Sequence, residues 1–114
     1  MNQFVPQVSD SDVERIIRRD HPVEEQEDIR EIIRQLEVSE KPRIVLACLK
    51  NSGGDIAKLK RELAEARGYY REQIGEAEYP NYMKKIFRID TLSEAEKAGI
   101  VEKDKNQYLA WLHE

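Results

Sequence analysis

The feature that most constrains the fold is an apolar run near the middle of the chain, Ile44-Val45-Leu46-Ala47-Cys48-Leu49. A helix formed by these residues has no polar side, so other helices must surround it. The pair Gly53-Gly54 then supplies the positive φ that ends a helix, and Asp55 suits the N-terminus of the next one. The stretch 42–77 therefore predicts a central hairpin of two antiparallel helices.

Length and composition limit the class of protein. A chain of 114 residues is the size of one domain, and its 39% hydrophobic and 37% charged residues are typical of a soluble, helix-rich protein. No apolar run reaches the roughly 18 residues needed to cross a bilayer, and the first residues lack the pattern of a signal peptide. We therefore expect one domain, a cytoplasmic location and no membrane partner. The net charge of −4 also argues against nucleic acid as a partner.

Helical periodicity divides the chain into a body and a tail. Residues 1–10 are expected to be a flexible start, residues 12–78 a four-helix body, and residues 79–114 a tail whose short helices pack back on the body. The segment 83–92 matches neither the helix nor the strand pattern. The overall prediction is an all-α single domain of five or six helices, either a bundle or a short superhelical stack of antiparallel helix pairs.

Three residues define the predicted boundaries in the second half of the chain. Ser39 is placed to cap the third helix, Gly99 is typical of a helix end, and Asp104 is placed to cap a last helix. Trp111 in that last helix is expected to anchor the tail to the body.

The long helix predicted up to residue 78 has two distinct faces. At about 100° per residue, its core face consists of Ile56, Leu59, Leu63, Ala66, Tyr70, Ile74 and Ala77. A second face is a narrow stripe of small residues, formed by Ala57, Ala64, Gly68 and Gly75. Glycine inside a helix costs roughly 1 kcal/mol relative to alanine, so two glycines on one line require a reason. We expect the chain's own C-terminal segment to lie along the stripe or the helix to bend at the glycines. The alternative is a groove for a second helix or a partner.

Charged residues of opposite sign border this stripe. Glu65, Glu72 and Glu76 flank one edge, and the other edge is basic, with Tyr69 pointing away from the core. Arginine and tyrosine are enriched at protein interfaces. The candidate interaction surface consists of Ala57, Lys60, Ala64, Arg67, Gly68, Tyr69, Arg71 and Gly75.

Two short motifs suggest a resemblance to known sequences. Glu78-Tyr79-Pro80 ends the helical body, and Asp104-Lys105-Asn106-Gln107-Tyr108-Leu109-Ala110-Trp111-Leu112 lies near the terminus. Together they resemble a group of small, uncharacterised bacterial all-α proteins. The resemblance covers most of the chain and implies a helical fold and a bacterial, intracellular setting. It implies no activity, cofactor or catalytic residue.

The sequence contains no recognisable catalytic or metal-binding pattern. Its two histidines, His21 and His113, are far apart, and the single Cys48 lies inside the apolar run, where it is expected to pack as a small hydrophobe. The acidic cluster 24–28 complements the dipole of its helix and lacks the EF-hand pattern. We therefore name no catalytic, cofactor-binding or metal-binding residue.

These observations favour a non-catalytic binding or adaptor protein that acts through helix surfaces on another protein or on a second copy of itself. The alternative is a small-ligand-binding protein or enzyme with a pocket between the C-terminal tail and the central hairpin. That pocket would use Tyr79, Tyr82 or Trp111 with Arg67 or Arg71. A third, less favoured hypothesis is nucleic-acid binding through Lys58, Lys60, Arg61, Arg67 and Arg71.

Overall fold

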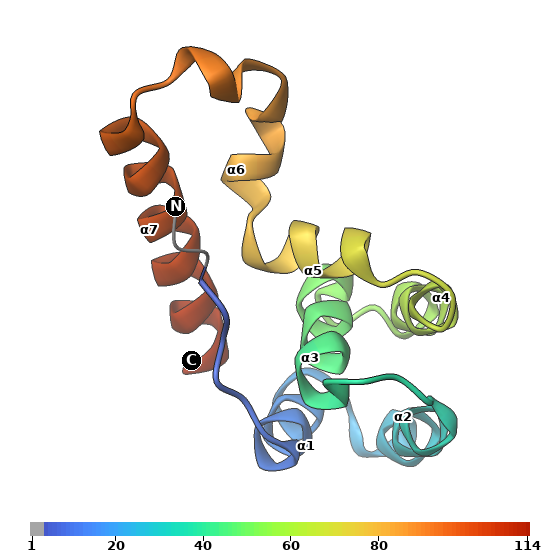
Figure 1. Ribbon diagram of the computed structural model, residues 1–114. Coiled ribbons are helices and arrows are strands. Elements are labelled where there is room, and N and C mark those ends of the chain that lie inside the picture. The colour runs from blue at the N-terminus through green and yellow to red at the C-terminus, as the bar shows by residue number, and fades with distance from the viewer. Residues whose placement is uncertain (1–3) are drawn as a thin grey trace.

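The computed structural model describes residues 4–114, and every regular element in them is helical (Figure 1). The all-α prediction is confirmed, but the predicted five or six helices are too few. Residues 4–114 contain seven α-helices and one 3₁₀ helix: α1 (Asp10–Asp20), α2 (Val23–Gln35), α3 (Lys41–Ser52), α4 (Ile56–Ala66), α5 (Arg71–Glu78), α6 (Pro80–Lys84), η1 (Ile86–Thr91) and α7 (Glu94–Leu112).

Helix α3 is the central helix, as its sequence predicts. All six residues of the apolar run 44–49 are at most 1% exposed, and α1, α4 and α5 pack against this helix. Pro42 lies in its first turn. The residue before the helix is Glu40 in the left-handed conformation (φ 50°), so Ser39 is not the cap.

The turn between α3 and α4 follows the prediction closely. Gly53 and Gly54 have φ values of 57° and 87°, which strain any residue with a Cβ. Asp55 then caps α4, because its carboxylate accepts a hydrogen bond of 3.1 Å from the backbone N–H of Lys58. Local sequence signals therefore set the turn, but the two helices are not antiparallel as expected: in Figure 1, α4 is seen end-on while α3 lies in the plane of the picture.

The predicted long helix is broken in two, which is the main correction to the expected fold. Helix α4 ends at Ala66 and α5 begins at Arg71, so the body has five helices instead of four. Glycine at position 68 weakens the helix locally. Both α4 and α5 nevertheless pack against α3, and the predicted core positions are buried or pack on the core on both sides of the break.

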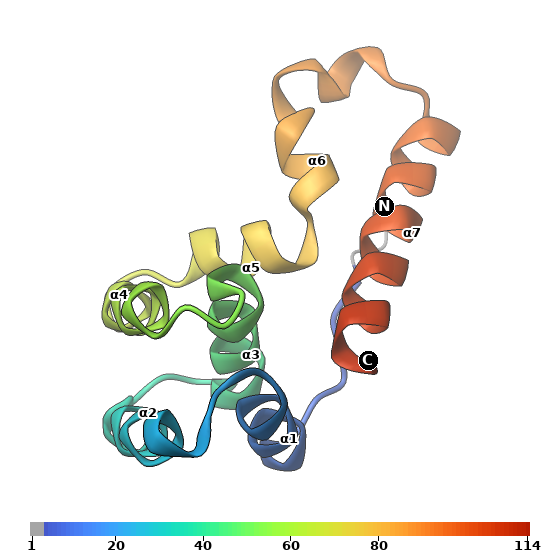
Figure 2. The same cartoon turned by 180° about the vertical axis from the view of Figure 1, so that it is seen from behind.

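Helices α6, η1 and α7 form an arm that extends from the body and returns to it (Figures 1 and 2). Pro80 begins α6, and the segment 83–92, which the sequence assigns to neither helix nor strand, contains the end of α6 and η1. Helix α7 begins with a capping box formed by Ser93 and Glu96. It continues through Gly99, so this glycine does not end a helix.

Asp104 caps a helix, but not the one predicted. It lies in the interior of α7 and is 1% exposed. Its carboxylate accepts hydrogen bonds from the backbone N–H groups of Asn81 (3.0 Å) and Tyr82 (3.0 Å) and from the side-chain amide of Asn81 (2.7 Å). The two backbone N–H groups belong to the first turn of α6, where no carbonyl within the helix can accept their hydrogen bonds. Asp104 therefore holds α6 against α7.

The C-terminal end of α7 is attached to α1 by two arginines. Arg15 Nη1 donates to the carbonyl of Leu112 and Arg19 Nη1 to that of Trp111, both at 2.6 Å. Their positive charge also complements the C-terminal end of the helix dipole. Arg19 lies 5.3 Å from the centre of the Trp111 ring, and Trp111 packs against the core. Trp111 therefore has the contacts expected of an anchor.

The segment before α1 also contacts α7 and the body. Phe4 packs edge-on against the buried ring of Tyr108, with ring centres 5.8 Å apart, and its carbonyl accepts a hydrogen bond from the Tyr79 hydroxyl. The flexible start predicted for residues 1–10 thus has tertiary contacts from Phe4 onward, while its first three residues lie outside the described part of the chain.

A buried ion pair links the start of α3 to the end of α5. Glu78 is 0% exposed, and its two carboxylate oxygens each accept a hydrogen bond of 2.8 Å from the guanidinium of Arg43. Burial raises the pKa of Glu78 above its ordinary value, although the hydrogen bonds and charge of Arg43 oppose the rise. The buried carboxylate thus depends on Arg43 to offset the cost of removing its negative charge from water.

None of the helices within residues 4–114 combines the length and the apolar character that a bilayer-crossing segment requires.

Candidate functional site

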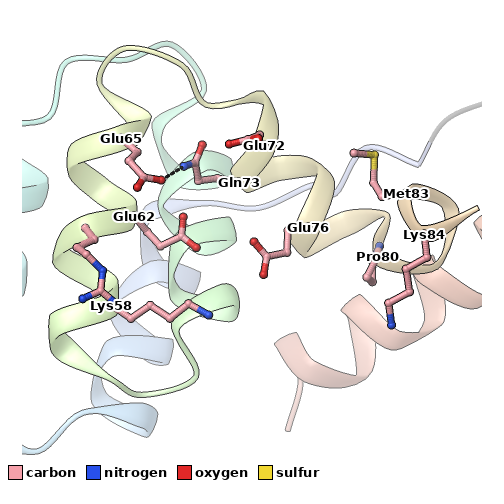
Figure 3. Close-up of a pocket in the computed structure, with 10 residues that line it drawn as sticks. Lys58, Glu62, Glu65, Glu72, Gln73, Glu76, Pro80, Met83 and Lys84 are labelled. Atoms are coloured by element: carbon pink, nitrogen blue, oxygen red, sulfur yellow. Dashed lines mark hydrogen bonds between the residues drawn. The ribbon is translucent and has the colours of Figure 1, made fainter. Parts of the chain in front are cut away.

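A cleft of about 580 Å³ lies between α4, α5 and α6 (Figure 3). It is open to solvent and lies beside the break between α4 and α5. Its walls are formed by Lys58, Arg61, Glu62, Glu65, Glu72, Gln73, Glu76, Pro80, Met83 and Lys84. We call this hollow the acidic cleft, because four of its ten lining residues are glutamates.

Helical spacing explains why these side chains meet. The α4 residues at positions 58, 61, 62 and 65 and the α6 residues at 80, 83 and 84 recur three and four apart, so each set lies on one face of its helix. The face on α4 adjoins the core positions Leu59 and Leu63. Packing of those leucines against α3 therefore turns the charged face towards α5 and α6.

Two glutamates face each other across the cleft. In Figure 3 the carboxylates of Glu62 on α4 and Glu76 on α5 point towards one another. Glu62 is only 7% exposed. Burial raises its pKa above the ordinary value, and the like charges of Glu76 and Glu65 add to the rise. The ionised form of Glu62 is therefore destabilised in the cleft.

The four glutamates of the cleft lack ion-pair partners within residues 4–114. No lysine or arginine nitrogen lies within 4.0 Å of their carboxylates, although many other acidic side chains of the chain have such a partner. Lys58, Arg61 and Lys84 also line the cleft. The cleft thus combines cationic residues with glutamates that have unused hydrogen-bond acceptors.

Gln73 adds an unused acceptor in the wall of the cleft. It is 2% exposed, and its Nε2 donates to Glu65 Oε2 at 3.2 Å while its backbone carbonyl accepts a bond from Asn51 at 3.0 Å. Its Oε1 is buried and has no hydrogen-bond partner among the described residues. A buried acceptor without a donor costs about 1–3 kcal/mol. The arrangement therefore favours a ligand that donates N–H groups.

The side chains of the kinds that most often bind metals or act as nucleophiles include the acidic residues, Cys48 and His21. Within residues 4–114 no group of three or more histidine, cysteine, aspartate or glutamate side chains is arranged to hold a metal ion. Cys48 is fully buried, and burial raises its pKa to about 12, so the thiol is protonated at neutral pH. The buried His21 is instead bonded through Nδ1 to Glu25 at 3.0 Å.

The predicted interaction surface is divided by the helix break. Ala57, Lys60 and Ala64 lie exposed on α4, and Arg71 is exposed at the start of α5. The intervening residues 67–69 form the exposed turn between the helices, with Tyr69 58% exposed as expected. The eight residues therefore do not form one continuous stripe on a single helix.

Only one glycine of the predicted stripe is covered by the chain's own tail. Gly75 is buried, and a Cβ placed on it would lie 3.5 Å from the Sδ and Cε atoms of Met83 in α6. A Cβ on Gly68 would have no neighbour within 4 Å. The expectation that the tail lies along the stripe therefore holds at its last position and fails at Gly68.

The acidic cleft differs from the pocket that the sequence suggested. Tyr79, Tyr82, Trp111, Arg67 and Arg71 do not line it. The sequence pattern places Glu65, Glu72 and Glu76 at the edge of the stripe and indicates no role for Glu62 and Gln73. The three- and four-residue spacing of the α4 face was a usable signal, but nothing local indicated that α5 and α6 would close around it.

No protein-family model, curated protein or solved structure matches this chain.

Proposed function

We propose that the chain is a non-catalytic protein-binding module that holds a basic side chain of its partner in the acidic cleft. The observation that supports this most directly is the buried, unpartnered Oε1 of Gln73 in the wall of a cleft that also contains the facing carboxylates of Glu62 and Glu76. All three groups accept hydrogen bonds. A ligand that satisfies them must donate N–H groups, and one that relieves the repulsion between the carboxylates must be positively charged.

Arginine is the residue best suited to this cleft. Its planar guanidinium has five N–H donors and can bridge several acceptors, whereas the ammonium of lysine has three on a single atom. Pro80 and Met83 provide apolar surface at the α6 side of the cleft, against which the aliphatic part of a long basic side chain can pack. Lys58, Arg61 and Lys84 disfavour a ligand with several closely spaced positive charges. An arginine flanked by apolar residues therefore suits the cleft better than an uninterrupted run of basic residues.

A small cationic molecule is the second candidate ligand. The cleft volume of about 580 Å³ falls within the range of roughly 300–1,000 Å³ found for small-molecule sites. Its lining is more charged than that of most such sites, which favours a protein segment. The nucleic-acid hypothesis has less support, because Lys58 and Arg61 share the cleft with four glutamates.

The test is isothermal titration calorimetry with a short capped peptide that contains one arginine, a matched peptide that contains citrulline, and spermidine. We expect the arginine peptide to bind and the citrulline peptide, which has the same shape without the charge, to bind at least about tenfold more weakly, equivalent to 1.4 kcal/mol. Stronger binding of spermidine than of the arginine peptide would favour the small-molecule alternative.

Three variants locate the binding site. Glu76→Gln and Gln73→Met should each weaken the arginine peptide at least about tenfold, while Glu102→Gln, which removes the same charge from an exposed position on α7, should leave its affinity unchanged. Gln73→Met also removes the unpartnered acceptor, so it should not lower the stability of the fold. Equal binding by the wild type and both cleft variants would refute the proposal.

A further inference from the structure

The outer end of the arm has an unusual surface. Residues 85–88, which we call the tip, comprise Lys85, Ile86, Phe87 and Arg88. They lie where the chain leaves α6 and enters η1, at the end of the arm far from α1 to α4 (Figures 1 and 2). The Phe87 side chain is 98% exposed and Ile86 is 43% exposed. The tip therefore presents an aromatic ring to solvent between two cations.

Such a surface is typical of a contact site. A phenylalanine side chain removes about 150–250 Å² from water when it is buried, and nearly none of that area is buried in the single chain. Aromatic residues and arginine are enriched at interfaces, where lysine and glutamate are depleted at the centre. Lys85 and Arg88 give the tip a positive charge, so its partner must provide apolar surface and negative charge together.

The acidic cleft has that combination. Four glutamates without ion-pair partners and the unpartnered Oε1 of Gln73 require cationic donors, and Pro80 and Met83 provide apolar surface beside them. The chain does not use its own tip for this purpose, since Phe87 remains 98% exposed. The charge and the apolar character of the tip and the cleft are therefore complementary between two molecules.

The arrangement of tip and cleft also permits a closed dimer. Met83 and Lys84 line the cleft, and the tip follows them directly in the sequence. Two copies related by a two-fold axis can thus each insert a tip into the cleft of the other. Such an interface is the same on both sides and leaves no site open for further growth.

We propose that the acidic cleft receives the tip of a second copy of this chain, so that the protein forms a reciprocal two-fold dimer. This inference rests on the proposed function, because it names the partner of the same cleft. Arg88 provides the guanidinium that enters the cleft, and Phe87 packs on the apolar surface at its α6 side.

Sedimentation equilibrium of the full chain between about 5 and 500 μM tests the assembly. The wild type should show a monomer–dimer equilibrium in this range. Phe87→Ser should shift the dissociation constant upwards by at least about tenfold, and the exposed-site control Glu102→Gln should leave it unchanged. A wild type that stays monomeric at 500 μM, or a dimer that is unaffected by Phe87→Ser, would overturn the inference.

A charge exchange tests the pairing of tip and cleft directly. The tip variant Lys85→Glu/Arg88→Glu and the cleft variant Glu72→Lys/Glu76→Lys change only exposed side chains, so both should fold, as circular dichroism will verify. Each alone should be monomeric, because like charges then meet at both contacts of the dimer. An equimolar mixture should form a heterodimer, visible by native mass spectrometry, since both contacts then pair opposite charges. A mixture that contains no heterodimer contradicts the proposed pairing.

The arginine peptide distinguishes failure of this inference from failure of the proposed function. The monomeric Phe87→Ser chain has a free cleft, so it should bind the peptide more tightly than the wild type does. Peptide binding together with a monomeric wild type would refute the dimer alone, whereas a Phe87→Ser chain that binds no peptide would refute the proposed function. Binding of the wild-type monomer to vesicles of anionic lipid, lost in Phe87→Ser, would assign the tip to a membrane surface and overturn the dimer.

Discussion

Replacement of Asp104 by alanine tests the contact that holds the arm together. The carboxylate is 1% exposed and accepts three hydrogen bonds of 2.7–3.0 Å, two of them from backbone N–H groups in the first turn of α6. Loss of a helix cap costs about 0.5–2 kcal/mol, and a hydrogen bond to a charged group contributes about 1.5–3 kcal/mol. Because the three bonds share one carboxylate and are not additive, we expect Asp104→Ala to lower the free energy of unfolding by about 2–4 kcal/mol.

Urea unfolding followed by circular dichroism measures this change. A domain of this size has a total stability of about 5–15 kcal/mol, so the expected loss is a large and readily measured fraction. Asp104→Asn retains one acceptor oxygen and should have an intermediate effect. Asp90→Ala removes an exposed carboxylate from η1 and should stay within about 0.5 kcal/mol of the wild type.

Amide hydrogen exchange shows whether the loss arises at the predicted place. In Asp104→Ala the backbone N–H groups of Asn81 and Tyr82 lose their acceptor, so their exchange should accelerate more than that of the α3 amides. A change of less than about 0.5 kcal/mol, equal to the Asp90→Ala control, would refute the reasoning. A global loss of stability without faster exchange at Asn81 and Tyr82 would refute the assignment of Asp104 as the cap of α6.

Four further predictions concern other parts of the molecule. Because its pKa is raised in the folded state, Glu62 binds its proton more tightly there and destabilises the fold as the pH rises. Glu62→Gln should therefore raise the melting temperature at pH 7 and have little effect below about pH 4; no gain at pH 7 would contradict this. Arg43→Met leaves Glu78 buried without a partner and should cost about 3–5 kcal/mol in urea unfolding, largely recovered if Glu78 is also replaced by methionine. Trp111→Ala should cost about 2 kcal/mol in the same assay, less than the 3–5 of a fully buried aromatic ring, because the ring is only partly buried. The Cys48 thiol, whose pKa burial raises to about 12, should react with a thiol reagent only in denaturant; fast reaction of the native chain would refute its burial.

The break between α4 and α5 shows that helical periodicity predicts which residues are buried but not where a helix ends. The core face predicted over residues 56–77 is correct on both sides of the break, since Leu59, Leu63, Ala66 and Ala77 are all at most 1% exposed. Periodicity reports which residues are apolar at helical spacing, and it does so equally well for one helix or two. The break is instead determined by the separate packing of α4 and α5 on α3, with glycine at position 68 lowering the cost.

Asp104 shows a different limit of local reasoning. The sequence identifies it as a residue suited to capping a helix, and it does cap one. Its partners Asn81 and Tyr82, however, lie 23 and 22 residues earlier in the chain. The chemistry of the side chain is local information, whereas the choice of its partner depends on where α7 packs.

The sequence by itself determined the central helix and the turn that follows it. An apolar run has no alternative to burial, and Gly53-Gly54 with Asp55 sets the turn and the next helix start within a few residues, so these features depend on short-range physics alone. Tertiary structure decided the helix break, the course of the arm and the acidic cleft. Each depends on contacts between segments far apart in the chain, and such contacts are selected by the packing of the whole core. The cleft exists because α5 and α6 close over a charged face that the sequence of α4 alone assigns to solvent.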